Sequence, residues 1–319
     1  MVYHIFFFQL IGDWSSKRRI SDGKALQICG GEEQKRKTAK KIKKEKSKKD
    51  EERKEEKTGP SRSLVFRCSF SPLKNLMERI KNKLTDEHTA IMSATPFRHI
   101  FEMLYEDKLQ VTQINNQDIK KAVFSLLDCY SEDDVGFIIS NNLIKFTVED
   151  VAVLLGLKAF GVDIEKNCSH DKHKESTLFK KYFDGKRSIY KDQISDRIVQ
   201  LLEDENHVRD DVVLLIITYI CITILFSNSA NRLLWSHTPY FDNLKIMQNV
   251  NWAAAVHSFL VDKLNENCKR KMLPKEHKDF QDTNSVMGGC TIILLVSATV
   301  FTFSSTKFIV LNKNMLTNC

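Results

Sequence analysis

The apolar residues downstream of Ser71 recur every three or four positions, which predicts a series of amphipathic helices. Ser71 and Pro72 open the first one, because proline fits the first turn of a helix. The apolar faces of three early helices are Leu73, Leu76, Met77, Ile80 and Leu84; Phe97, Ile100, Phe101 and Leu104; and Ile119, Val123, Phe124 and Leu127. Further helices are predicted at residues 189–202, 210–226 and 252–264.

The segment KFTVEDVAVLLGL, residues 145–157, predicts a short helix with both ends marked. Thr147 can cap its N-terminus, with Asp150 at the capping-box position in place of the preferred Glu or Gln. Gly156 can adopt the left-handed conformation that ends a helix. Val148, Val151, Ala152 and Leu155 then line one face. Residues 137–139, Phe-Ile-Ile, precede this helix as a short predicted strand.

The last long helix has Trp252 and Phe259 seven positions apart on one face, so both are expected in the core. The same face also holds Ala255, Val256, Leu260 and Leu264. The predicted fold class is therefore mainly α, a multi-helix globular domain with at most a small strand pair. We place this domain at residues 63–296, after an N-terminal arm, residues 1–62, and before an atypical tail, residues 297–319.

Two apolar runs raise the question of a membrane. The run at 212–226 has 15 residues and the run at 290–303 has 14, whereas a spanning helix needs about 20. Both are interpreted as buried helices, so no membrane partner is predicted. A tail-anchored protein that uses residues 290–311 stays open as an alternative.

Charge is concentrated in one segment. Residues 35–57 contain 13 basic and 6 acidic residues, although the whole chain has a net charge of only +8. Such a run cannot bury enough apolar surface to fold, so a disordered arm is expected. It is typical of nuclear-localisation signals and of non-specific nucleic-acid binding, although a merely solubilising tail is the alternative. The residues proposed for this role are Lys35, Arg36, Lys37, Lys40, Lys41, Lys43, Lys44, Lys46, Lys48 and Lys49.

The candidate chemistry is sparse. Cys168, His170 and His173 can each bind zinc, but a structural zinc site usually has a second pair of ligands, and none is evident. Cys129 and Cys290 are interpreted as buried thiols, because a catalytic cysteine needs an adjacent base and oxyanion donors. No catalytic, metal-binding or cofactor-binding residue is therefore predicted.

Paired small and acidic residues have structural interpretations. Gly288 and Gly289 are expected to allow close packing of the backbone. The acidic pairs 133–134 and 210–211 are placed at helix starts, where carboxylates favour the helix dipole. The eight cysteines are scattered singly without a CxxC pair, which favours reduced thiols in the nucleus or cytosol.

Five segments occur in an order that resembles the plant mobile domain, also called "aminotransferase-like". They are residues 64–88, 145–161, 210–232, 251–266 and 288–296. The domain is found in transposon-encoded proteins and in the N-terminal region of plant proteins that also carry a ubiquitin-like (SUMO) protease domain. The hallmark segment of that family matches Glu149, Asp150, Val151, Leu155, Gly156, Leu157 and Gly161.

The resemblance implies a non-enzymatic nuclear protein of transposon origin that acts through protein or nucleic-acid contacts. Its partner protein is not specified. An N-terminal fragment of a SUMO protease without its catalytic domain is the alternative. Because the sequence after residue 296 departs from the family pattern, a C-terminally truncated product is also expected.

Overall fold

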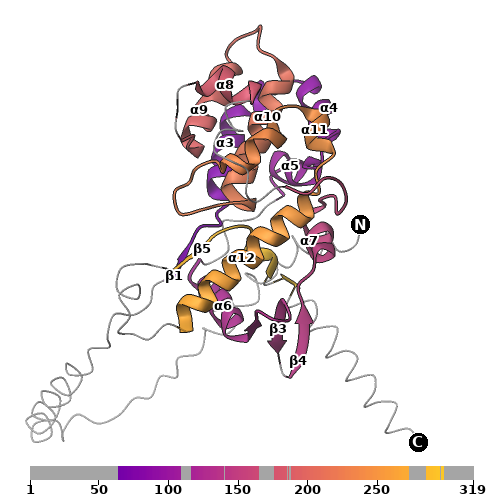
Figure 1. Cartoon of the computed structure of the whole chain (residues 1–319). Helices are drawn as coiled ribbons and strands as arrows, with labels where there is room; N and C mark the ends of the chain where they lie inside the picture. The colour runs from indigo at the N-terminus through magenta and orange to yellow at the C-terminus, as the bar shows by residue number, and fades with distance from the viewer. Residues whose placement is uncertain are drawn as a thin grey trace, which may run out of the picture.

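A computed structural model describes residues 64–108, 116–139, 141–164, 176–184, 186, 188–272, 285–294 and 296–297. Helix α12, Trp252–Met272, runs diagonally between an upper group of helices and a lower part with α6, β3 and β4 (Figure 1). The upper group contains α3 (Ser71–Ile80), α4 (Asp86–Ser93), α5 (Arg98–Tyr105), α8 (Thr177–Phe183), α9 (Lys191–Leu201), α10 (Arg209–Ile220) and α11 (Leu244–Gln248). The mainly α prediction is confirmed.

The strands form two small sheets rather than a single pair. Strands β1 (Leu64–Phe66) and β5 (Ser285–Met287) pair in parallel, so two ends of the described chain lie side by side (Figure 1). Strands β2 (Tyr130–Ser131), β3 (Gly136–Ile139) and β4 (Asn142–Lys145) form an antiparallel sheet after α6, Asn116–Cys129. The strand predicted at residues 137–139 is thus confirmed as part of β3.

Helix α10 forms the centre of the core. Every residue from Val212 to Ile220 is buried, and the helix continues as a wider π-type turn, η5, Cys221–Leu225. Helices α4 and α9 pack against it, so the apolar run at 212–226 is enclosed by protein, as predicted. Cys290, Ile293 and Leu294 are fully buried as well. None of the helices within the described ranges is long and apolar enough to cross a membrane.

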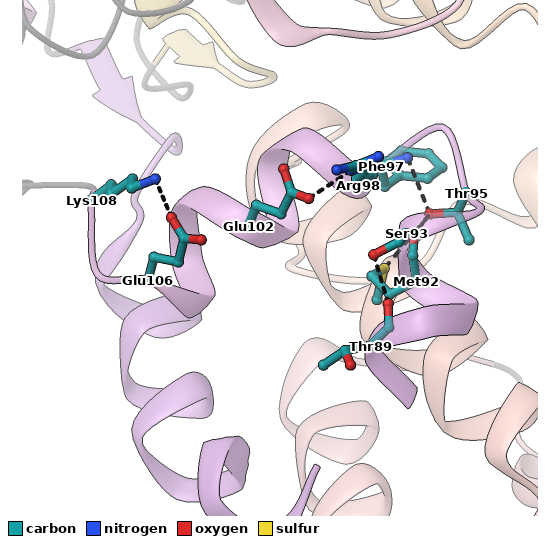
Figure 2. Close-up of polar contacts among 9 residues, drawn as sticks. All are labelled: Thr89, Met92, Ser93, Thr95, Phe97, Arg98, Glu102, Glu106 and Lys108. Carbon is teal, nitrogen blue, oxygen red and sulfur yellow. Dashed lines mark hydrogen bonds and ion pairs between the residues drawn. The ribbon is translucent and has the colours of Figure 1, made fainter. Parts of the chain in front are cut away.

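The corner between α4 and α5 is fixed by polar contacts. Thr95 donates its hydroxyl to the Met92 carbonyl at 2.7 Å and accepts from the Phe97 amide at 3.3 Å (Figure 2). Arg98 then pairs with Glu102 along α5, at 2.6 Å between Nε and Oε1. The corner aims the apolar face of α5 inward, and Phe97, Ile100, Phe101 and Leu104 are all buried as predicted.

Trp252 joins elements that are distant in the sequence. It is fully buried, with its ring 4.9 Å from that of Phe97 and 5.3 Å from that of Phe241. Its indole nitrogen donates to the Met247 carbonyl at 2.9 Å. The core prediction for Phe259 is only partly right, because this ring is half-buried and packs edge-on against Phe226.

Helix α12 is eight residues longer than the predicted segment, which ended at Leu264. The apolar pattern stops there, but α12 continues because Asn267 and Cys268 are buried against neighbouring elements. The Asn267 amide donates to the Val286 carbonyl of β5 at 3.3 Å. A polar residue therefore fills a core position, which hydrophobic periodicity cannot reveal.

The smaller predictions have mixed outcomes. A Cβ on Gly288 would lie 2.0 Å from the Ser227 carbonyl oxygen, so close backbone packing is confirmed. Asp210 and Asp211 lie in the first turn of α10 as predicted. Asp133 and Asp134 do not: they lie in the β2–β3 turn, where Asp134 accepts from the Ser131 hydroxyl at 2.8 Å.

Cys129, predicted to be buried, is half-buried at the end of α6.

Candidate interaction surface

Helix α7, Val148–Leu155, is a fixed base for the residues that follow it. The Thr147 amide donates to Asp150 Oδ2 at 2.8 Å, and the Asp150 amide donates to Thr147 Oγ1 at 3.3 Å. The predicted capping box is confirmed, as is the left-handed Gly156, whose φ is 67°. Val151 and Leu155 are buried, and α7 packs against α12.

The chain beyond Gly156 is tied down at both of its sides. The Lys158 carbonyl accepts from the Ala253 amide of α12 at 3.0 Å. The Lys158 ammonium donates to the Gln248 carbonyl at the end of α11, at 3.1 Å. Two helices therefore hold the start of this loop in one position.

Gly161 fixes the next part of the loop. Its φ of +127° is one that side chains rarely permit, and a Cβ there would lie 2.2 Å from the Asn249 carbonyl oxygen. Val162 donates its amide to that same carbonyl at 2.7 Å and accepts from the Asn251 amide at 2.9 Å. Only glycine allows the loop to approach the α11–α12 connection so closely.

This rigid loop presents apolar side chains to solvent. Phe160 is 69% exposed and Val162 is 61% exposed, the two highest values among the large apolar side chains that the structure describes. The Lys158 ammonium lies 5.3 Å from the centre of the Phe160 ring, within cation–π range. We call Lys158, Phe160 and Val162 the 158–162 surface.

The β3–β4 hairpin offers a second exposed apolar pair. Ile138 and Leu143 are directly opposite each other and are 50% and 43% exposed, whereas their neighbours Phe137 and Ile144 are buried. Strand β4 has one partner strand among the described residues. This pair is smaller than the 158–162 surface and carries no aromatic ring.

The described part of the chain does not have the charge excess of a nucleic-acid-binding domain. It carries 23 Lys and Arg against 25 Asp and Glu. Binding to a phosphate backbone depends on a cluster of basic side chains that displace counterions. The residues predicted for that role, Lys35 to Lys49 as named above, lie outside the described residues.

The buried thiols are poor nucleophiles. Burial raises the pKa of Cys221 well above its ordinary value and also raises that of Cys268. A hydrogen bond with Cys68, together with burial, raises the pKa of Cys290. All three thiols therefore stay protonated near neutral pH, and the thiolate is the reactive form.

Metal binding has no visible site in the described ranges, where no three His, Cys, Asp or Glu side chains are grouped to hold an ion. Cys168, His170 and His173, considered as zinc ligands from the sequence, lie outside those ranges.

Sequence reasoning did not single out Phe160. The available signal was local: an aromatic residue between two helix-breaking glycines, Gly156 and Gly161, close behind a capped helix. Periodicity assigns no face to such a loop residue, so its exposure depends on where α11 and α12 lie.

Comparison with known proteins gives one match. A family model described as a domain of unknown function (DUF8566) matches residues 66–295. No curated protein and no solved structure matches the chain.

Proposed function

The chain belongs to the family of the domain of unknown function DUF8566, and we propose that it is a non-enzymatic module that binds another protein through its 158–162 surface. The observation that carries this proposal is the exposure of Phe160 on a loop held by backbone hydrogen bonds to α11 and α12.

The energetics favour such a role. Aromatic side chains dominate binding energy at protein interfaces, and full burial of a phenylalanine contributes about 1.5–3 kcal/mol. A loop that is already fixed loses little conformational entropy on binding. Phe160 therefore suits an anchor that enters a pocket on a partner, with Val162 beside it and Lys158 at the rim.

The proposal that the module is not an enzyme rests on separate observations. The thiols of Cys221, Cys268 and Cys290 are buried and have raised pKa values, so none of them is poised as a nucleophile. Nuclear localisation, transposon origin and the resemblance to the plant mobile domain stay predictions, as does the alternative of a SUMO protease fragment.

Site-specific photo-crosslinking in cells tests the contact. A photoreactive phenylalanine analogue at position 160 should form an adduct with a discrete partner, whereas the analogue at Val208, another exposed apolar position, should not. The Phe160→Ala variant should bind the purified partner about 10- to 100-fold more weakly while its thermal unfolding stays unchanged. Identical adducts from both positions, or unchanged affinity of Phe160→Ala, would contradict the proposal.

We also propose that the basic arm drives nuclear import and weak, salt-sensitive binding to nucleic acid. Replacing Lys40, Lys41, Lys43 and Lys44 by Ala should move a fluorescent fusion into the cytoplasm. An unchanged nuclear signal would rule out the import function, and binding that does not respond to salt would rule out the nucleic-acid contact.

A further inference from the structure

Two histidines from distant parts of the chain meet between α4 and the connection from α9 to α10. His88 Nε2 lies 2.9 Å from His207 Nε2. His88 is in the first turn of α4 and only 2% exposed, whereas His207 is half-buried in the connection. Neither residue belongs to the 158–162 surface.

The remaining ring nitrogens define where the protons are. His88 Nδ1 accepts from the Thr85 backbone amide at 3.1 Å, and an amide can only donate, so the proton of neutral His88 is on Nε2. His207 Nδ1 lies 2.5 Å from the Asp204 carbonyl oxygen, which can only accept, so the proton of neutral His207 is on Nδ1. His88 Nε2 therefore donates to His207 Nε2.

The ring geometry fits this hydrogen bond and not a shared metal ion. The ring centres are 5.0 Å apart, 2.1 Å more than the two nitrogens, and the planes differ by 18°. The rings thus lie nearly head to head. An ion on this line, bonded to each nitrogen at about 2.0–2.1 Å, would need the nitrogens about 4 Å apart.

This arrangement has no place for an additional proton. A proton on His88 Nδ1 would face the Thr85 amide hydrogen, and would remove the acceptor that caps the start of α4. A proton on His207 Nε2 would face the hydrogen of His88 Nε2. Protonation of either ring therefore breaks the contact between them.

The neighbouring charges act in both directions. Arg209, at the start of α10, disfavours a charged His88, and Glu87 of α4 favours one, while these two residues form an ion pair with each other. Lys83 and Glu203 form a second ion pair between the same two segments, at 3.0 Å. Carboxylates and basic side chains keep their charges between pH 5 and 8, so the histidines are the titrating part of this junction.

From this geometry we infer that the His88–His207 hydrogen bond is a proton-sensitive latch, closed when both rings are neutral and opened when either ring gains a proton. Opening releases the connection at residues 202–208 from α4. The half-buried His207 is the ring that can turn into solvent, and it takes the connection with it.

Burial, His207 and Arg209 together lower the pKa of His88 from its ordinary value of 6.5 in the closed state. The open state, with a solvated ring, has the higher pKa and so binds protons preferentially. As the pH falls below about 6.5, the open state gains population and the latch contact is lost. Above that pH both states are neutral and the contact is fully retained.

Hydrogen exchange of the full chain tests the latch at about pH 7.5 and about pH 5.5, on either side of the ordinary histidine pKa. After correction for the intrinsic pH dependence of exchange, amides at residues 202–209 should open about tenfold more at the lower pH. Amides at residues 252–260 of α12 report global unfolding and serve as the internal reference.

Two variants make the test specific. His207→Gln offers an oxygen acceptor to His88 but does not titrate, so its exchange relative to α12 should not depend on pH in this range. Glu203→Gln removes the neighbouring ion pair and should keep the wild-type response. Nitrogen NMR of the wild type at the higher pH should show the Nε2–H form of His88 and the Nδ1–H form of His207, whatever the stability of the variants.

Three outcomes would overturn the latch. They are equal corrected exchange at both pH values, a pH response that persists in His207→Gln, and the opposite tautomer on either ring. Protection of residues 202–209 by added Zn²⁺ at the higher pH would also overturn it, because the pair would then be a metal site.

Discussion

At the scale of single residues, Gly161 and Phe160 illustrate how one position determines the exposure of another. Gly161 brings the loop against the Asn249 carbonyl, and this approach leaves Phe160 no neighbour to cover it. The exposed ring is thus a consequence of backbone geometry.

Replacement of Gly161 by alanine should destabilise the protein. The added Cβ meets a backbone oxygen at 2.2 Å, and the φ of +127° is strained for any side chain. We expect a loss of about 1–3 kcal/mol in the free energy of unfolding, measured by urea denaturation. Ala159→Gly, an exposed neighbour in the same loop, is the matched control and should change stability by less than about 1 kcal/mol. Equal effects of the two substitutions would show that the loop can move away from Asn249.

His237 should make stability depend on pH. Complete burial next to the Phe226 ring lowers its pKa from 6.5 to about 4. The unfolded chain therefore takes up a proton as the pH falls below about 6.5, whereas the folded chain does not until about pH 4. Stability is highest above pH 6.5 and falls as the pH approaches 4.

The contribution of His237 amounts to about 2–3 kcal/mol over that interval. Urea denaturation at about pH 7 and about pH 4.5 should show a smaller loss for His237→Gln than for the wild type, because glutamine does not titrate. Equal losses in the two proteins would mean that His237 becomes protonated within the fold.

At the scale of elements, α7 is short and depends on its caps. A helix of two turns is marginal by itself, so the Thr147–Asp150 exchange of hydrogen bonds and the docking of Val151 on the core both contribute.

Thr147→Ala should cost about 1 kcal/mol in the free energy of unfolding, because the Asp150 amide loses its acceptor. Thr147→Ser keeps the hydroxyl and should stay within about 0.5 kcal/mol of the wild type. Thermal unfolding monitored by circular dichroism provides the comparison. A serine variant as unstable as the alanine variant would assign the effect to the lost methyl group and not to the cap.

At the scale of the whole molecule, Trp252 joins segments that no local signal connects. Phe97 precedes α5, Phe241 ends the η6 turn (Trp235–Phe241), and both rings pack on the indole. Trp252→Ala should therefore cost about 3–5 kcal/mol, the range for a buried aromatic residue.

Phe259→Ala is the comparison on the same helix, and it should cost less because this ring is half-buried. Denaturant unfolding of both variants measures the difference. A loss for Phe259→Ala that equals or exceeds that for Trp252→Ala would contradict the packing described for α12.

The sequence by itself determined the local features of this protein. Apolar periodicity placed the buried faces of α3 and α5, and the Thr147 and Gly156 signals placed the ends of α7, because caps and amphipathic faces depend on residues only a few positions apart. Charge placed the basic segment at 35–57 in the same way.

Only the tertiary structure decided the features that depend on distant residues. The pairing of β1 with β5, the extension of α12 to Met272, the exposure of Phe160 and the meeting of His88 with His207 each need a partner from another part of the chain. Such contacts follow from how the helices pack. A polar residue such as Asn267 or His88 becomes buried only where packing supplies its hydrogen-bond partners, and no sequence period records that supply.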